Sequence, residues 1–133
     1  MKVHISLPVK NLNDTKEFYS KLLNSQAVKK KSDYLKFEPS HIPLNLTFNE
    51  SASKVEGTHF GIQVEDMETL DSERERLASL NLITSEENSS VCCYALQNKI
   101  WLRDPDGHMW EIFYVIEDSE NKIDDNSQCC GKG

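Results

Sequence analysis

Hydrophobic and polar positions follow the same pattern twice along the chain. Residues 3–9 and 58–64 both read as an alternating strand, and His4 and His59 stand at equivalent places in the two copies. In each copy a helical pattern follows the strand, and three further strand-like segments follow the helix. Self-similarity in a fixed order is the mark of a repeated structural unit. The sequence therefore predicts a βαβββ module that occurs twice.

The expected elements can be given as residue ranges. Helices are predicted over 11–23 and from Asp66 to about Asn81, where apolar side chains recur at helical spacing. Residues 104–107, with the sequence Asp-Pro-Asp-Gly, predict a turn between the last two strands. The predicted strands are 3–9, 27–31, 34–38 and 43–49 in the first module, and 58–64, 83–85, 94–103 and 109–116 in the second. We expect an α+β protein with one domain over residues 1–117, made of modules 1–50 and 57–117.

Three ionisable side chains stand out against this pattern. Strand alternation puts His4 and His59 on the sheet face opposite the apolar face that the helices cover. Glu111 lies between Trp110 and Ile112, and an acid in an apolar strand is costly unless it is paired or bound to a metal. Two histidines and one carboxylate suit non-haem Fe(II) and leave positions open for oxygen and substrate. The alternative is that the three are unrelated polar residues of the strands.

The repeat also allows a comparison between the two modules. Residues 44–48 are taken as the counterpart of residues 110–114, which places Asn45 where Glu111 stands. A neutral amide is a poor ligand for a divalent transition metal, so we expect three protein ligands rather than four. Of the other histidines, His41 is expected in a loop and His108 is expected to be solvated after the turn.

Composition limits the partners and the location. The 133 residues carry a formal net charge of −7, which argues against binding to a nucleic acid. No apolar run is long enough to cross a bilayer, and the first residues do not resemble a signal peptide, so we expect a cytoplasmic protein with no membrane association. The acidic residues 118–133 are expected to form a mobile tail that contains two cysteines.

The four cysteines come as two adjacent pairs, Cys92–Cys93 and Cys129–Cys130. Neighbours on a regular strand face opposite ways, so two thiols that act together are expected on a loop, and residues 86–91 are polar enough to form one. Thiolates select soft metals and metalloids, and a dithiol can hold trivalent arsenic through two As–S bonds. The alternative is that Cys92 and Cys93 are small packing residues.

Taken together, the doubled module, the strand histidines and the segment from Asp104 to Glu111 resemble the vicinal oxygen chelate superfamily, also called the glyoxalase/bleomycin resistance/dioxygenase superfamily. The resemblance covers about residues 1–117. It implies a cup-shaped, eight-stranded mixed sheet that holds a metal. Glyoxalase I carries a fourth, acidic ligand in the strand that corresponds to residues 44–48, so Asn45 argues against that activity.

Residues 88–99 and 43–47 resemble the organoarsenical carbon–arsenic lyases of this superfamily, whose relatives are often described as cadmium-induced proteins. This resemblance implies Fe(II)- and O2-dependent cleavage of trivalent methyl- or aryl-arsenicals to arsenite. By position it implies that iron binds to His4, His59 and Glu111, and that arsenic binds to Cys92 and Cys93. Ni2+ or Zn2+ can occupy such a site after purification. Cys129 and Cys130 are possible accessory thiols.

Other classes of function stay open at this point. The thiols could sequester cadmium or arsenite in a non-catalytic stress protein. A glyoxalase or fosfomycin-resistance type metalloenzyme is another alternative. The fosfomycin resistance proteins also use two histidines and one glutamate, but vicinal thiols have no evident use in their chemistry. A drug-binding module without metal is a weaker alternative. The chain could act as a monomer or as a homodimer.

Overall fold

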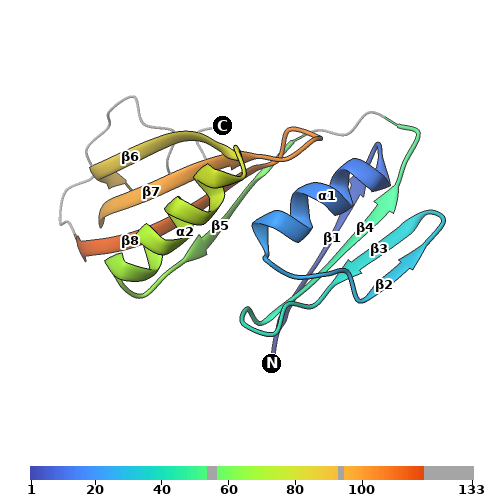
Figure 1. Ribbon diagram of the computed structural model, residues 1–133, viewed down its shortest axis with the longest axis horizontal. Helices are drawn as coiled ribbons and strands as arrows, with labels where there is room; N and C mark the ends of the chain where they lie inside the picture. Colours follow the sequence, from blue (N-terminus) through green and yellow to red (C-terminus); the bar gives the residue numbers. More distant parts are fainter. Residues whose placement is uncertain (54–56, 93–94, 119–133) are drawn as a thin grey trace. The chain divides into compact units, whose positions relative to one another are not determined.

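A computed structural model describes residues 1–53, 57–92 and 95–118, and the side chains of residues 89–95 and 117–118 are outside the description. The elements occur in the predicted βαβββ order, twice (Figure 1). The first module contains β1 (Val3–Val9), α1 (Leu12–Leu22), β2 (Lys29–Lys31), β3 (Tyr34–Phe37) and β4 (Leu44–Glu50). The second contains β5 (His59–Gln63), α2 (Met67–Ser79), β6 (Ile83–Cys92), β7 (Ala95–Arg103) and β8 (Met109–Asp118). The α+β class and the doubled module are confirmed.

The strands of the described residues form two four-stranded mixed sheets. The order is β1-β4-β3-β2 in the first and β5-β8-β7-β6 in the second, so the two modules have the same topology. In each sheet the first strand of the module runs parallel to the last strand, and the other neighbouring strands are antiparallel. The expectation of one eight-stranded sheet is corrected to two sheets. A sequence repeat predicts strands, but it does not show whether hydrogen bonds continue from one module to the next.

The chain divides into two compact units. The first comprises residues 1–57 together with 104–107, and the second comprises residues 58–103 together with those from His108 onward. The turn between β7 and β8 therefore belongs to the first unit, although both strands belong to the second. Each unit carries one helix on its sheet: α1 packs on β3 and β4, and α2 packs on β6 and β8 (Figure 1).

Local sequence explains the helix of the first unit. Asn11 caps α1 by accepting a hydrogen bond from the backbone N–H of Asp14 at 3.0 Å. The carboxylate of Glu50 accepts a further hydrogen bond from the backbone N–H of Leu12 at 3.0 Å, which places a negative charge at the positive end of the helix. These contacts begin the helix one residue after the range predicted from the sequence.

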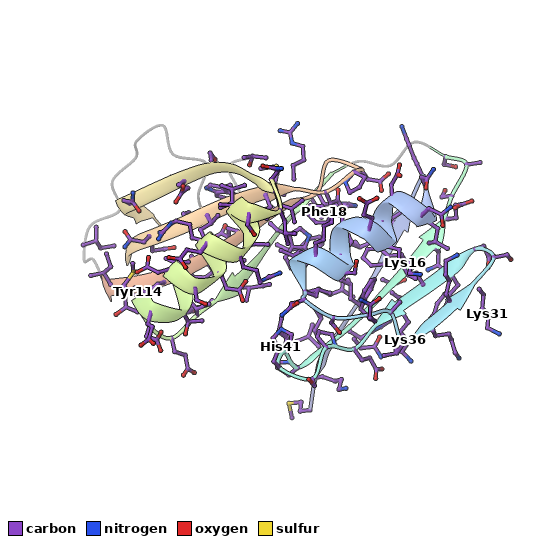
Figure 2. The ribbon with its side chains drawn as sticks, in the orientation of Figure 1. Lys16, Phe18, Lys31, Lys36, His41 and Tyr114 are labelled. Atoms are coloured by element: carbon purple, nitrogen blue, oxygen red, sulfur yellow. The ribbon has the colours of Figure 1, made fainter. Side chains whose placement is uncertain are left out.

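Aromatic side chains form the core of the first unit. The ring of Tyr19 lies 4.5 Å from that of Phe48 and 6.4 Å from that of Phe37, measured between centroids. Phe18, the residue before Tyr19 in α1 (Figure 2), meets Tyr19 edge-on, with 5.0 Å between the ring centroids. Leu35 is fully buried beside them. Burial of each such side chain contributes about 1.5–3 kcal/mol to folding.

The turn at residues 104–107 forms as predicted. Gly107 adopts a positive φ of 90°, and its N–H donates to the carbonyl of Asp104 at 3.1 Å. Asp104 also accepts the backbone N–H of Asp106 through its side chain at 2.9 Å. The hydroxyl of Tyr19 donates to the other carboxylate oxygen of Asp104 at 2.7 Å, and the N–H of Lys10 donates to Asp106 at 3.0 Å. These last two contacts make the turn part of the first unit.

One prediction about the second unit is wrong. Residues 86–91 were expected to form a loop, but they lie within β6, which pairs with β7 from Ile83–Leu102 to Cys92–Ala95. The register shifts twice along this pair. β6 is the outermost strand of its sheet, and an edge strand tolerates polar side chains because much of its surface is open to water. Pairing with β7 therefore overrides the polar composition.

In the part of the chain that the structure describes, no helix has the length and apolar character to cross a membrane.

Candidate metal centre

His59 and Glu111 come together on one face of the second sheet. β5 and β8 run parallel with Gly61 opposite Glu111, so His59 and Glu111 are diagonal neighbours whose side chains project to the same side. The Nε2 atom of His59 is in contact with Oε2 of Glu111. Glu111 is buried, and His59 is partly buried. An imidazole nitrogen and a carboxylate oxygen therefore converge on one point.

Gly61 provides the space in which the side chain of Glu111 lies. A Cβ atom at position 61 would be 3.0 Å from Cγ of Glu111 and 3.2 Å from the ring of Phe113. Real Cβ atoms rarely make contacts this short, so a larger residue would displace one of these side chains. A glycine on β5 therefore allows the carboxylate of β8 to fold across the strand toward His59.

Lys99 is a site residue that the sequence reasoning missed. Its Nζ donates to Oε1 of Glu111 at 3.3 Å, and only 1% of the residue is exposed. The ammonium also lies 5.5 Å from the ring centroid of Trp101 and 5.8 Å from that of Phe113. The two oxygens of Glu111 thus have different partners: Oε1 faces Lys99, and Oε2 faces His59.

A signal for Lys99 was present in the sequence. Ile100 and Leu102 alternate as apolar residues of β7, which places Lys99 and Trp101 on the opposite face. The register pairs Trp101 directly with Glu111, so that face is the face of the metal candidates. Without the register, a lysine in a strand reads as an ordinary exposed residue.

Trp101 shields the pair from one side. Its ring centroid lies 5.0 Å from that of His59. The indole N–H of Trp101 donates to Oε2 of Glu87 at 2.7 Å, which fixes the orientation of the ring. An apolar ring beside a ligand lowers the local dielectric and limits the approach of water.

His4 lies in the first unit and is held by Asn45. Nδ1 of His4 is 3.1 Å from the backbone oxygen of Asn45 and 3.0 Å from its side-chain oxygen. Both atoms are acceptors, so Nδ1 carries the proton, and Nε2 is the nitrogen available to accept or to bind a metal. A histidine ligand is usually fixed in this way by a hydrogen bond at its other nitrogen.

A carboxylate extends this arrangement. The side-chain amide of Asn45 donates to Oε1 of Glu38 at 3.0 Å, which orients the amide oxygen toward His4. Glu38 in turn pairs with Lys2 at 3.7 Å and with Lys36 at 3.4 Å; Lys36 extends from β3 (Figure 2). Glu38 therefore has cationic and amide partners of its own and acts on His4 only through Asn45.

The register corrects the counterpart assigned to Glu111. β1 and β4 pair His4 with Asn45 and Ser6 with Thr47, whereas β5 and β8 pair His59 with Met109 and Gly61 with Glu111. When the two histidines are superimposed, Thr47 rather than Asn45 corresponds to Glu111. The alternating pattern could not separate the two, because a shift of two residues keeps every side chain on the same face. Neither counterpart is an acid, so the expectation of three protein ligands is unchanged by the correction.

The remaining histidines differ in environment. His108 was expected to be solvated, but it is buried and accepts a hydrogen bond from the backbone N–H of Thr58 at 3.1 Å. Its ring also lies 6.0 Å from that of Phe60. It therefore packs against the chain that leads into β5, a contact that depends on tertiary structure. His41 is exposed between β3 and β4, as expected.

The structure brings together only part of the predicted set. His59 and Glu111 form a pair in the second unit, and His4 belongs to the first. Within either unit, the described residues contain no cluster of three His, Cys, Asp or Glu side chains. Cys92 ends β6, and Cys93, Cys129 and Cys130 lie outside the described residues, as does most of the predicted tail.

The donors that are present fit a divalent transition metal. Nε2 of His59 and Oε2 of Glu111 converge, and Nε2 of His4 is the ring nitrogen that Asn45 does not hold. Imidazole suits Zn, Cu, Fe and Ni, and two histidines with one carboxylate are the ligands that Fe(II) oxygenases use. The chemistry of the residues is therefore compatible with Fe(II), and equally with Ni2+ or Zn2+.

Comparison with known proteins assigns the class. Residues 3–112 match the Glyoxalase/Bleomycin resistance protein/Dioxygenase superfamily. The chain belongs to this superfamily, which confirms the resemblance noted from its residues.

Curated relatives are more specific. The chain is 42% identical over 131 residues to a protein of Bacillus sp. (strain MD1) named trivalent organoarsenical cleaving enzyme, with 96% of this chain and 81% of that protein covered. It is 40% identical over 131 residues to a protein of Bacillus subtilis (strain 168) named probable trivalent organoarsenical cleaving enzyme, with 96% and 89% covered. It is 36% identical over 121 residues to the cadmium-induced protein CadI of Mycobacterium bovis, with 90% and 79% covered.

Solved structures agree on the fold. A glyoxalase/bleomycin resistance protein/dioxygenase from Alicyclobacillus acidocaldarius superimposes with a TM-score of 0.70 at 17% identity, covering 88% of this chain and 92% of that chain. A fosfomycin resistance protein from Listeria monocytogenes, solved with Mn(II) and sulfate, has a TM-score of 0.62 at 27% identity, covering 84% and 87%.

Proposed function

We propose that this protein cleaves the carbon–arsenic bond of trivalent methyl- or aryl-arsenicals and releases arsenite, in a reaction that uses Fe(II) and O2. The observation that carries the proposal is the contact between His59 and Glu111, which joins two metal-donor atoms in one sheet. Membership of the superfamily and the names of the Bacillus relatives support the choice of substrate.

In the proposed centre, Fe(II) is held by His4, His59 and Glu111. Three protein ligands leave positions open for oxygen and substrate. When bound, the iron supplies the redox chemistry that activates dioxygen. Because Ni2+ and Zn2+ compete well for nitrogen and oxygen donors, metal exchange under anaerobic conditions is part of any test.

The chain's own residues have separate tasks in this proposal. Asn45 keeps the proton of His4 on Nδ1, which leaves Nε2 as the donor. Trp101 packs against His59 and limits the access of water. Donors that are held in place before the reaction reduce the reorganisation that it requires.

Arsenic enters this proposal as part of the substrate, held by Cys92 and Cys93. A dithiol forms two As–S bonds, and the second bond forms at high effective concentration. Cys92 is the last residue of β6 and pairs with Ala95 of β7, the strand that also carries Lys99 and Trp101. Cys129 and Cys130 are proposed only as accessory thiols.

A second candidate is a thiol-based stress protein that binds cadmium or arsenite without catalysis. The observation in its favour is the 36% identity to relatives named cadmium-induced protein. This candidate predicts tight, thiol-dependent binding that does not respond to replacement of Glu111. A glyoxalase or fosfomycin-resistance type metalloenzyme is the third, and the fosfomycin resistance protein among the structural neighbours supports it at the level of class.

The decisive experiment is a single-turnover assay. The protein is purified anaerobically, loaded with Fe(II), mixed with trivalent methyl- or phenylarsenical, and exposed to oxygen. The arsenic species are then separated by chromatography and quantified. We expect arsenite from the wild type and a loss of at least about 100-fold in Glu111→Ala and Cys93→Ser, since each removes a group that the reaction requires.

Two matched variants serve as controls. Glu17→Ala removes an acid from the exposed face of α1, and His41→Ala removes an exposed histidine. Both should retain wild-type activity. Arsenical that is recovered bound but intact from the iron-loaded wild type would overturn the proposal and favour the thiol-based binder.

A further inference from the structure

Lys99 is a buried cation beside a proposed metal ligand. Burying a lysine to 1% exposure is costly unless its ammonium is paired, and Lys99 forms an ion pair with Oε1 of Glu111 at 3.3 Å. A positive charge close to a bound divalent cation is also unfavourable, because the two charges repel. A lysine at this position would therefore weaken metal binding by its charge, so its pairing with a proposed metal ligand calls for an explanation.

The contacts around Glu111 suggest one. Lys99 engages Oε1, while Oε2 is directed toward His59. A Cβ atom at Gly61 would meet both Glu111 and the ring of Phe113, so the two side chains lie on either side of the space above this glycine. The ammonium of Lys99 lies over the ring of Phe113, 5.8 Å from its centroid, so a cation–π interaction favours the cation on that side.

We propose that Lys99 is a positioning residue that restricts Glu111 to binding the metal through Oε2 alone. A carboxylate can bind a metal through one oxygen or through both. If both oxygens bound, Glu111 would fill a position that the reaction needs to keep open. Lys99 prevents this by occupying Oε1 with a charge-assisted hydrogen bond. This inference rests on the proposed metal centre, but not on the identity of the substrate.

The inference predicts an unusual pair of effects for Lys99→Met, which replaces the ammonium by an apolar side chain of similar length. Metal affinity should rise about 10-fold, the usual size of effects from residues around a ligand, because the repulsion is lost and the second oxygen becomes available. At the same time, a smaller fraction of the bound iron should be able to take up an added ligand, because the second oxygen of Glu111 fills the open position. A merely structural role would instead weaken metal binding.

The test measures both quantities without an arsenical. Fe(II) affinity is determined anaerobically by competition with a chromophoric chelator. The open position is probed with nitric oxide, whose adduct with Fe(II) is counted by electron paramagnetic resonance. We expect Lys99→Met to bind Fe(II) more tightly and to give less nitric oxide adduct per iron. Lys21→Met, which removes a partly exposed lysine of α1 that pairs with Glu17, should change neither.

Lys99→Gln is a second variant, which keeps the inference testable if Lys99→Met does not fold. The glutamine amide can still donate to Oε1, but it carries no charge. We therefore expect a smaller rise in Fe(II) affinity and a smaller loss of nitric oxide adduct than in Lys99→Met. Thermal unfolding verifies that each variant is folded. Unchanged or weakened Fe(II) binding in the folded variants would overturn the inference.

Two further outcomes keep this inference distinct from the proposed function. Glu111→Ala should weaken Fe(II) binding, and if it does not, the proposed centre is wrong and the inference falls with it. If Lys99→Met behaves as expected while the wild type leaves arsenicals intact, the role of Lys99 stands and the proposed reaction is wrong.

Discussion

Glu111 shows how one side chain depends on residues from two neighbouring strands. Gly61 of β5 leaves the space for it, Lys99 of β7 binds Oε1, and His59 of β5 meets Oε2. The carboxylate could be predicted from the sequence, because an acid in an apolar strand is conspicuous. The alternation of β7 could assign Lys99 to a sheet face, but the roles of Gly61 and Lys99 depend on the register between strands, which the sequence does not give.

The space at Gly61 can be tested directly. Gly61→Ala should lower the free energy of unfolding by about 1–3 kcal/mol, because the new methyl group would overpack against Glu111 and Phe113. It should also weaken Fe(II) binding, since Glu111 is displaced. Denaturant unfolding and chelator competition measure the two effects. Gln63→Ala, on the same strand at an exposed position, is the control; equal stability and metal affinity in Gly61→Ala would contradict this description of the site.

At the level of elements, helix ends follow local sequence closely. Asp66 caps α2 by accepting the backbone N–H of Thr69 at 2.7 Å. Hydrogen bonds from the side chain of Thr69 and then from its backbone hold the pKa of Asp66 below its ordinary value. The strand of residues 83–92 shows the opposite case, because its polar composition predicts a loop, and only pairing with β7 makes it a strand.

The cap of α2 predicts a pH-dependent effect. Because the pKa of Asp66 is lower in the folded protein, its ionised form stabilises the fold above the unfolded-state pKa, and this contribution is lost as the pH falls below about 4. Asp66→Ala should therefore lower the melting temperature at pH 7, and the difference from wild type should shrink as the pH falls through this range. Glu65→Ala, the adjacent exposed acid, should have little effect. A difference that stays constant from pH 7 to pH 3 would argue against the cap.

At the level of the whole molecule, the doubled βαβββ order was predictable because it repeats a sequence pattern that begins at His4 and again at His59. The division into two sheets was not, because hydrogen bonding between modules leaves no periodic signal. The same holds for the burial of His108, whose partner Thr58 is close to it only in the folded chain. Residues far apart in sequence therefore determine the parts of the site that the pattern missed.

The hydrogen bond between Tyr19 and Asp104 joins positions far apart in the chain. Tyr19→Phe should lower the free energy of unfolding by about 1–3 kcal/mol, since the buried carboxylate of Asp104 loses a donor at 2.7 Å. Urea unfolding measures the loss. Tyr34→Phe on β3, where the tyrosine is partly exposed, is the matched control. An unchanged midpoint in Tyr19→Phe would show that the bond contributes nothing to stability.

The placement of residues 104–107 has a consequence for the ancestry and dissection of this chain. The first unit is discontinuous in sequence, because it includes residues 104–107, a turn that lies within the second repeat. A gene fragment that ends at residue 57 would lack the acceptor for the Tyr19 hydroxyl and the acid that binds the N–H of Lys10. The two repeats are therefore not interchangeable units. A swap, a truncation or a circular permutation that separates this turn from the first repeat would remove buried contacts of the first unit.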